Sequence, residues 1–176
     1  MKVLGHGNLY PVGFMGSGKD KVGNLVAERM RRRIVNTDAL IVDSEAMSIN
    51  DIFDKYGEPY FRDSETEVLR EISRERDLVV SVGGGAFCQE NPRNRDILLA
   101  TGVVVWLDVS LDIIRERLKN KTDRPLARNP VEMAKLFEKR RQFYELADFR
   151  LEVSVERPPE EVAEELLRRI SWKELV

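Results

Sequence analysis

Residues 13 to 20 carry the pattern of a phosphate-binding loop that departs from the rule only at its last position. The general pattern is G-x-x-x-x-G-K-[ST], in which backbone amides surround phosphates, the lysine reaches the outer phosphates and the final hydroxyl ligates Mg²⁺. This chain reads Gly13-Phe14-Met15-Gly16-Ser17-Gly18-Lys19-Asp20. A carboxylate therefore stands where the hydroxyl is expected, so the loop predicts phosphate binding with altered metal chemistry.

The residues around this loop favour a strand before it and a helix after it. Apolar residues at 9, 10 and 12 predict a short buried strand, and those at 22, 25, 26 and 30 recur at helical spacing. A helix N-terminus offers free amides and a positive dipole end to an anion. The less favoured alternative is an ordinary glycine-rich turn. Pro11 lies inside the predicted strand, and we expect it where no neighbour needs its missing amide hydrogen.

Two further segments follow predicted strands, where ligands bind in open α/β sheets. Asp38, in Asn36-Thr37-Asp38, is placed to accept a proton from a substrate hydroxyl. The alternative is that Asp38 only caps the residues after it. The glycines 83–85 end the apolar run 78–82 and would let the backbone approach a ligand closely. Their alternative is a flexible turn.

Several arginines have the chemistry to hold anions. Arg62 could bind a carboxylate with two parallel hydrogen bonds, or simply pair with Glu65 three residues on. Arg124 lies in the polar, basic segment of about 119–130, which we interpret as a mobile lid, and Arg140 lies in Lys139-Arg140-Arg141. Proteins that transfer phosphoryl groups mainly position reactants and neutralise charge, so such arginines are expected. Taken singly, each is more often a surface residue.

Strands alternate with helical patterns along residues 1–176, which predicts one α/β domain with a parallel sheet and right-handed crossovers. The segments at about 38–65 and 119–130 look like insertions on this core. We expect strands at about 9–12, 34–35, 78–82, 103–107 and 151–155, the last at or near an edge. Expected helices span about 19–32, 48–57, 59–76, 91–100, 110–119 and 129–144, with a last one from 158.

Composition excludes several classes of function. The 29 basic and 31 acidic residues give a net charge of −2, so nothing in the balance predicts nucleic-acid or membrane partners. There is no apolar stretch of membrane-spanning length. Cys88 is the only cysteine, which favours a reducing, cytoplasmic location. His6 is the only histidine, so a histidine-centred mechanism has little to work with.

Together these segments resemble shikimate kinases, which are P-loop kinases of the nucleoside-monophosphate-kinase type. The resemblance implies a three-layer α/β/α fold with a five-stranded parallel sheet, a substrate-binding insertion and a lid. It also implies a monomer that uses ATP and Mg²⁺ to phosphorylate the 3-hydroxyl of shikimate, in aromatic amino acid biosynthesis. The matching segments are GFMGSGK at 13–19, TDALI at 37–41, SINDIF at 48–53, GEPYFRDSE at 57–65, SVGGGA at 81–86, RPL at 124–126 and K-R-x-x-x-Y at 139–144.

The resemblance also implies roles for individual residues. Lys19 resembles the lysine at the transferred phosphoryl group, Asp38 the acid that helps deprotonate the attacking hydroxyl, and Arg124 the lid arginine over ATP. The implied nucleotide-binding residues are Gly13, Gly16, Ser17, Gly18, Lys19, Asp20, Lys21, Arg124 and Arg157. The implied shikimate-binding residues are Asp38, Phe53, Phe61, Arg62, Gly83, Gly84, Gly85 and Arg140, with Arg62 and Arg140 on the carboxylate.

Three positions depart from the family pattern. Position 20 is Ser or Thr in the family, position 21 is commonly Thr, and position 36 is an Asp associated with Mg²⁺ through water; here they are Asp20, Lys21 and Asn36. We hypothesise a swap in which Asp20 supplies the charge lost at Asn36, with Lys21 offsetting part of the repulsion from phosphate. The alternatives are a non-catalytic relative that binds nucleotide or shikimate, and a kinase of another small hydroxy acid.

Overall fold

The computed structural model describes residues 7–88, 92–119, 129–155 and 157–170, and its centre is a five-stranded sheet. All four neighbouring pairs are parallel, in the order β2-β3-β1-β4-β5, which confirms the predicted fold class. The edge position of β5 is confirmed too. The strands are β1 (Asn8–Val12), β2 (Arg33–Asn36), β3 (Leu78–Ser81), β4 (Gly102–Val109) and β5 (Phe149–Val153).

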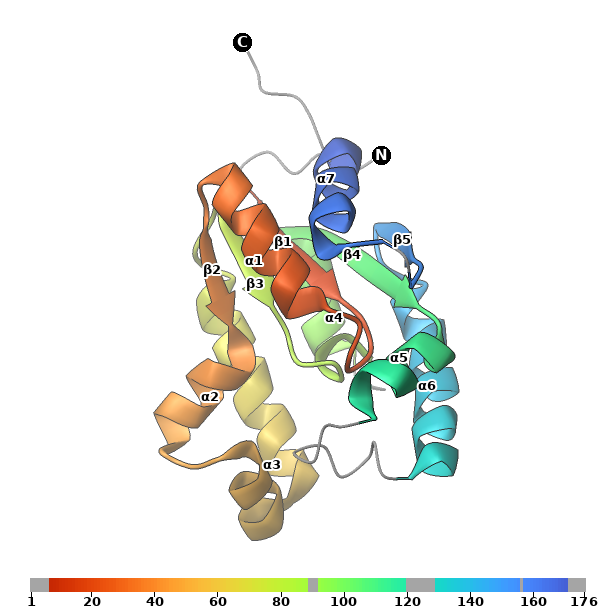
Figure 1. Cartoon of the computed structure of the whole chain (residues 1–176). Helices are drawn as coiled ribbons and strands as arrows, with labels where there is room; N and C mark the ends of the chain where they lie inside the picture. The colour runs from red at the N-terminus through yellow and green to blue at the C-terminus, as the bar shows by residue number, and fades with distance from the viewer. Residues whose placement is uncertain (1–6, 89–91, 120–128, 156, 171–176) are drawn as a thin grey trace.

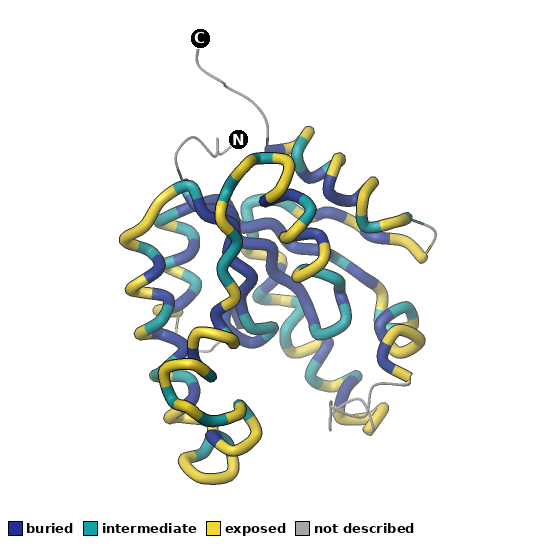
Figure 2. Tube along the Cα trace, turned by 60° about the vertical axis from the view of Figure 1, so that its left-hand side comes forward, coloured by how far each residue is buried: buried dark blue, intermediate teal, exposed yellow. Residues whose placement is uncertain are grey.

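Helices cover both faces of this sheet (Figure 1). The first and last, α1 and α7, pack together on one face, while α3 and α4 lie on the other. Figure 2 shows that the buried residues follow the strands and the inward sides of these helices, so the core lies on both sides of the sheet. The helices are α1 (Lys19–Met30), α2 (Thr37–Glu45), α3 (Ile49–Ile72), α4 (Arg93–Thr101), α5 (Leu111–Leu118), α6 (Pro130–Tyr144) and α7 (Pro159–Ile170), with a short 3₁₀ turn η1 (Ala86–Cys88).

Helix α3 contains a sharp bend at Gly57, where sequence analysis expected one helix to end and another to begin. Gly57 has φ 80° and ψ 172°, a conformation open to glycine, and Pro59 follows as a residue that favours a new first turn. Ser48 caps the first half by accepting a hydrogen bond from the Asp51 amide at 3.1 Å, as predicted. Helix α2, at the start of the predicted insertion, was not among the expected helices; it begins directly after β2.

The central strand β1 contains Pro11, although proline is usually confined to sheet edges. β1 has five register pairs with β4 but only one with β3, between Leu9 and Val79. The missing amide hydrogen of Pro11 accounts for this imbalance. The buried Asn8 side chain compensates on the β3 side, because its Oδ1 accepts from the Leu78 amide at 3.0 Å and its Nδ2 donates to the Glu75 carbonyl at 3.0 Å.

Gly102 marks the closest approach of β4 to β1. A Cβ atom at this position would lie 2.0 Å from the Asn8 carbonyl oxygen. Because that obstacle is backbone in the centre of the sheet, we expect Gly102→Ala to lower the free energy of unfolding by about 3 kcal/mol. The matched control is Gly23→Ala in the middle of α1, where the nearest atom is 3.5 Å away; it should stabilise by about 0.5 kcal/mol. Urea unfolding of both variants tests this pair, and equal effects would contradict it.

Within the described ranges, no helix is long and apolar enough to cross a membrane.

Candidate active site

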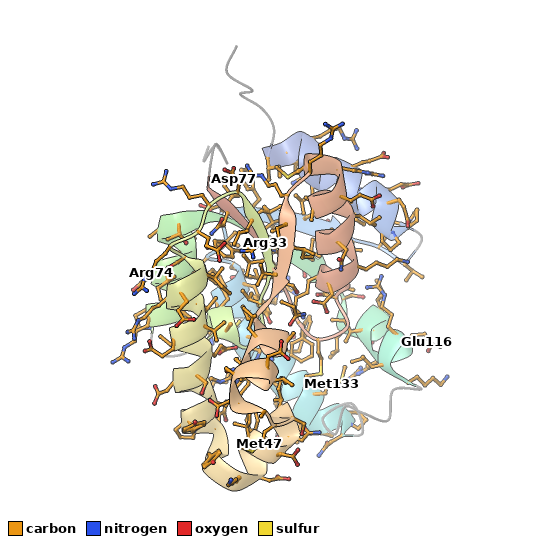
Figure 3. The ribbon with its side chains drawn as sticks, turned by 90° about the vertical axis from the view of Figure 1, so that its left-hand side faces the viewer. Arg33, Met47, Arg74, Asp77, Glu116 and Met133 are labelled. Carbon is orange, nitrogen blue, oxygen red and sulfur yellow. The ribbon has the colours of Figure 1, made fainter. Side chains whose placement is uncertain are left out.

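The candidate site lies at the carboxyl ends of β1, β2 and β3. In Figure 3, Arg33 and Asp77, at the amino ends of β2 and β3, lie at the opposite end of the molecule from Met47. Met47 joins α2 to α3, so these two helices extend beyond the carboxyl ends of the strands (Figures 1 and 3). Ligands of open α/β sheets bind at this end.

The glycine-rich loop connects β1 to α1, and within it the Ser17 amide donates to the Phe14 carbonyl at 3.1 Å. Gly16 and Gly18 have φ 76° and 89°, in the left-handed region that favours glycine. Gly18 is the N-cap of α1 and has no side chain to satisfy the first amides. The buried Ser17 hydroxyl has no hydrogen-bond partner in the structure. The loop therefore has the open geometry that phosphate binding needs.

A small cavity of about 160 Å³ joins this loop to the other predicted residues. Lys19 and Asp20 line its loop side. It is also lined by every residue that the resemblance assigned to substrate: Asp38, Phe53, Phe61, Arg62, Gly83, Gly84, Gly85 and Arg140. The rings of Phe53 and Phe61 pack against each other across the Gly57 bend, tilted by 37° with their centroids 4.8 Å apart. Residues from six separate segments thus meet at one place.

Two guanidinium groups converge on Gly85. A Cβ atom there would lie 2.8 Å from Nη2 of Arg62 and 2.8 Å from Nη2 of Arg140. Helix α3 supplies the first arginine and α6 the second. The absence of a side chain at Gly85 therefore leaves both cations facing a common point. Two guanidiniums in this arrangement suit a carboxylate ligand.

Arg62 is held by two glutamates on its own helix. Its Nη1 donates to Glu65 Oε2 at 3.0 Å, and its Nε and Nη2 donate to Glu58 Oε1 at 3.1 and 2.9 Å. Burial alone would lower the pKa of Arg62, but the two carboxylates outweigh that effect and the pKa is raised. The predicted alternative, a pair with Glu65, is present as well, but Glu65 is fully buried. The pair therefore belongs to the cavity wall, where it positions the guanidinium.

Asp38 and Glu65 face each other across Gly83. Asp38 Oδ1 and Glu65 Oε1 each lie 2.8 Å from the position of a Cβ at Gly83. The N-cap of α2 is Asn36, which accepts from the Ala39 amide at 3.0 Å, and not Asp38. Asp38 is left in the first turn of α2 with its carboxylate directed at the cavity. A carboxylate in this position can accept a proton from a bound hydroxyl.

The altered loop residue Asp20 contacts two other segments. Its Oδ1 accepts hydrogen bonds from the Ser81 hydroxyl and from Asn36 Nδ2, the second at 3.5 Å. Asp20 and Asn36, paired by the swap hypothesis, are therefore in direct contact. Sequence analysis missed Ser81, because nothing in the motif marks the last residue of β3 as a partner of position 20.

A second cavity, of about 490 Å³, lies on the other side of the loop. It is lined by Gly16, Ser17, Gly18, Lys21 and Arg157, all assigned to nucleotide, together with Arg117. Sequence analysis missed Arg117, whose Nη1 donates to the carbonyls of Gly16 and Ser17 at 3.1 and 3.2 Å. Nothing in the sequence distinguishes Arg117 from Arg115. Only the packing of α5 beside the loop shows that Arg117 is the one that reaches the loop carbonyls. Arg157 is held by Glu165 at 2.5 Å.

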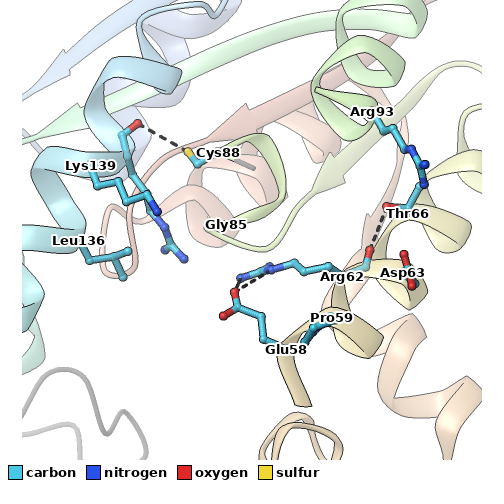
Figure 4. A pocket seen from close by; sticks show the side chains of 11 residues that line it. Glu58, Pro59, Arg62, Asp63, Thr66, Gly85, Cys88, Arg93, Leu136 and Lys139 are labelled. Carbon is cyan, nitrogen blue, oxygen red and sulfur yellow. Dashed lines mark hydrogen bonds and ion pairs between the residues drawn. The ribbon is translucent and has the colours of Figure 1, made fainter. Parts of the chain in front are cut away.

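The wall around Gly84 is completed by Tyr144. Burial raises the pKa of Tyr144 well above its ordinary value, so its hydroxyl stays protonated and donates to the Gly84 carbonyl. Burial also raises the pKa of Cys88 to about 12, which keeps this thiol unreactive near neutral pH. Figure 4 shows Cys88 in an adjoining open cavity, with Arg62 and Glu58 across from Leu136 and Lys139 of α6.

Arg124 and most of the predicted lid lie outside the described residues, so their position relative to the two cavities stays a prediction.

Comparison with known proteins gives one consistent result. The family model "Shikimate kinase" matches residues 15–171. A curated shikimate kinase of Sulfurihydrogenibium sp. (strain YO3AOP1) is 44% identical over 164 residues, which is 93% of this chain and 97% of that protein. One from Geobacter metallireducens is 44% identical over 160 residues, 89% of this chain and 88% of that protein.

Solved structures agree with this result. Shikimate kinase from Acinetobacter baumannii in complex with shikimate aligns with a TM-score of 0.84 at 33% identity, over 94% of this chain and 93% of that one. Shikimate kinase from Aquifex aeolicus aligns with a TM-score of 0.79 at 35% identity, over 93% of this chain and 95% of that one. With a matching family model and relatives of this identity along most of its length, the chain belongs to the shikimate kinase family.

Proposed function

We propose that this protein transfers the terminal phosphoryl group of ATP to the 3-hydroxyl of shikimate and releases ADP and shikimate 3-phosphate. The observation that carries this proposal is the pair of guanidiniums, Arg62 and Arg140, that meet at Gly85 in the cavity shared with Lys19 and Asp38. A small acid held by its carboxylate at Gly85 would extend toward Asp38 and the phosphate loop. The ring would then lie against Phe53 and Phe61.

In this arrangement each residue has a simple task. The Asp38 carboxylate accepts the proton of the substrate hydroxyl as the hydroxyl oxygen bonds to the phosphorus of ATP. The bond from that phosphorus to the oxygen of the leaving ADP breaks, and Lys19 with the loop amides neutralises the charge that develops. Arg117 and Arg157 flank the second cavity, which suits the remainder of the nucleotide. Arg124 would complete the charge neutralisation from the lid.

The residues near position 20 fit a divalent cation only in part. The Asp20 carboxylate is a suitable oxygen ligand. The Asn36 oxygen is turned toward the Ala39 amide, and its amide nitrogen faces Asp20, so it is less suited to hold a metal-bound water. Mg²⁺, when bound, would neutralise part of the charge of the phosphates. We propose Asp20 as its protein ligand. We also propose that the protein is a monomer and that it works in the cytoplasm.

The geometry favours a catalyst over a protein that only binds nucleotide or shikimate. Asp38 and Lys19 line the same cavity, whereas a protein that binds only shikimate or only nucleotide would need just one of these two residues. A kinase of another hydroxy acid would need a cavity matched to that acid, and this one is small and partly walled by the rings of Phe53 and Phe61.

A coupled assay of ADP release tests the proposal, with shikimate, quinate and gluconate compared as substrates in the presence of Mg²⁺. We expect rapid release with shikimate alone, and phosphorus NMR should show one new phosphate ester in an amount equal to the ADP. No release above background would support the binding-protein alternative. Faster release with another acid would support the alternative of a kinase for another small hydroxy acid.

A further inference from the structure

The carboxylate at the end of the phosphate loop affects which form of the nucleotide can bind to the site. Asp20 lies in the first turn of α1, directly after the loop lysine. Its Oδ1 is oriented by donors from β3 and from the end of β2, namely Ser81 and Asn36. These two contacts orient an exposed carboxylate at the cavity that Lys19 also lines. It cannot turn away from an incoming phosphate without losing both of them.

A carboxylate repels phosphate, whereas the hydroxyl of the general loop pattern does not. Lys21 lines the second cavity, whereas Asp20 lines the first one together with Lys19. A divalent cation would reverse the sign of the interaction, since it can bind the carboxylate and the phosphate oxygens at the same time.

The protein alone has too few ligands to hold such a cation. Among the described residues, no group of three or more His, Cys, Asp and Glu side chains has the geometry of a metal site. Mg²⁺ usually needs six oxygen ligands and keeps several waters. Nucleotide phosphates and Asp20 would therefore have to complete the coordination shell together.

We infer that Asp20 makes nucleotide binding conditional on a divalent cation, so that this chain selects the metal–nucleotide complex and rejects the free nucleotide. The inference rests on the proposed nucleotide site and adds to it a coupling between two ligands. Such coupling is reciprocal: the nucleotide should raise the affinity for the metal by the same factor. A hydroxyl at this position, which carries no charge, would couple the two ligands far more weakly.

Isothermal titration calorimetry with ADP, in Mg²⁺ or in EDTA, tests this coupling without any catalytic readout. We expect EDTA to weaken ADP binding by about 100-fold in the unaltered chain and by less than about 10-fold in Asp20→Ser. Free ADP should bind more tightly to Asp20→Ser than to the unaltered chain. Asp20→Asn keeps the shape of the side chain without its charge and should behave like Asp20→Ser. The coupling can therefore still be tested if one of the two variants folds poorly.

Asp43→Ser, at an exposed acid on α2, is the matched control and should keep the coupling of the unaltered chain. The double variant Asp20→Ser/Asn36→Asp restores the family residues at positions 20 and 36 and should bind free ADP better than the unaltered chain. Equal affinities for free ADP in the unaltered chain and both position 20 variants would overturn the inference. If shikimate is still phosphorylated in that case, the proposed function survives; if no form binds Mg²⁺·ADP, both fail.

Discussion

Replacing Arg62 with Met is expected to lower kcat/KM for shikimate by about 100-fold or more, mainly through KM. The variant removes one of the two guanidiniums that meet at Gly85 and leaves Arg140 alone to hold the substrate carboxylate. It also removes the ion pair of a fully buried carboxylate, Glu65. The free energy of unfolding should therefore fall by about 3 kcal/mol. Steady-state kinetics and urea unfolding measure the two effects.

The same helix provides a control for the loss of an arginine. Arg70 pairs with Glu67 at the same spacing, but both side chains are largely exposed, and an exposed pair contributes less than about 1 kcal/mol. Arg70→Met should leave KM and stability nearly unchanged. The double variant Arg62→Met/Glu65→Gln should regain stability, because the buried charge is gone, without regaining affinity for shikimate. If it recovers KM as well, Arg62 acts only as a structural residue.

Replacing Asp38 with Asn is expected to lower kcat by about 10²- to 10⁴-fold, the usual contribution of a positioned general base. The amide keeps the shape of the side chain but cannot take the proton of the attacking hydroxyl. The melting temperature should stay close to that of the unaltered chain, since the change removes one of two carboxylates that face each other across Gly83. Single-turnover kinetics at saturating shikimate isolates this step.

Asp43→Asn, on the exposed side of the same helix, is the corresponding control and should retain full activity. If Asp38→Asn keeps more than about a tenth of the normal kcat, the proton goes elsewhere and Asp38 only orients the substrate. If KM rises and kcat does not fall, binding is its main contribution.

The parts of the site that follow from local chemistry were predictable from the sequence. Glycines at fixed offsets and a lysine before a helical pattern predicted the loop between β1 and α1. Ser48 and Gly57 predicted where the halves of α3 begin and end, because a cap and a glycine conformation are local properties. The parallel sheet followed from the alternation of strands and helices.

The parts that depend on distant segments were not predictable in the same way. Ser81 meets Asp20 only because β3 lies between β2 and β1, an order that no local pattern specifies. Arg117 reaches the loop carbonyls only because α5 returns beside them. Helix α2 was missed because Asn36-Thr37-Asp38 has the composition of a loop, whereas its first residue is a helix cap. The burial of Glu65 could not be predicted either, because a glutamate three residues after an arginine usually indicates an ion pair on the helix surface.

The position of β1 between β3 and β4 constrains how the chain folds as it is synthesised. β1 and the loop after it leave the ribosome early, but β2, the next strand to emerge, is not a partner of β1. Its partners begin only at Leu78 and Gly102, so β1 is synthesised well before either of the strands that pair with it. Such delayed, non-local pairing slows folding and leaves a sheet edge open to wrong partners. The nascent phosphate loop is therefore complete in sequence long before the sheet exists to give it shape.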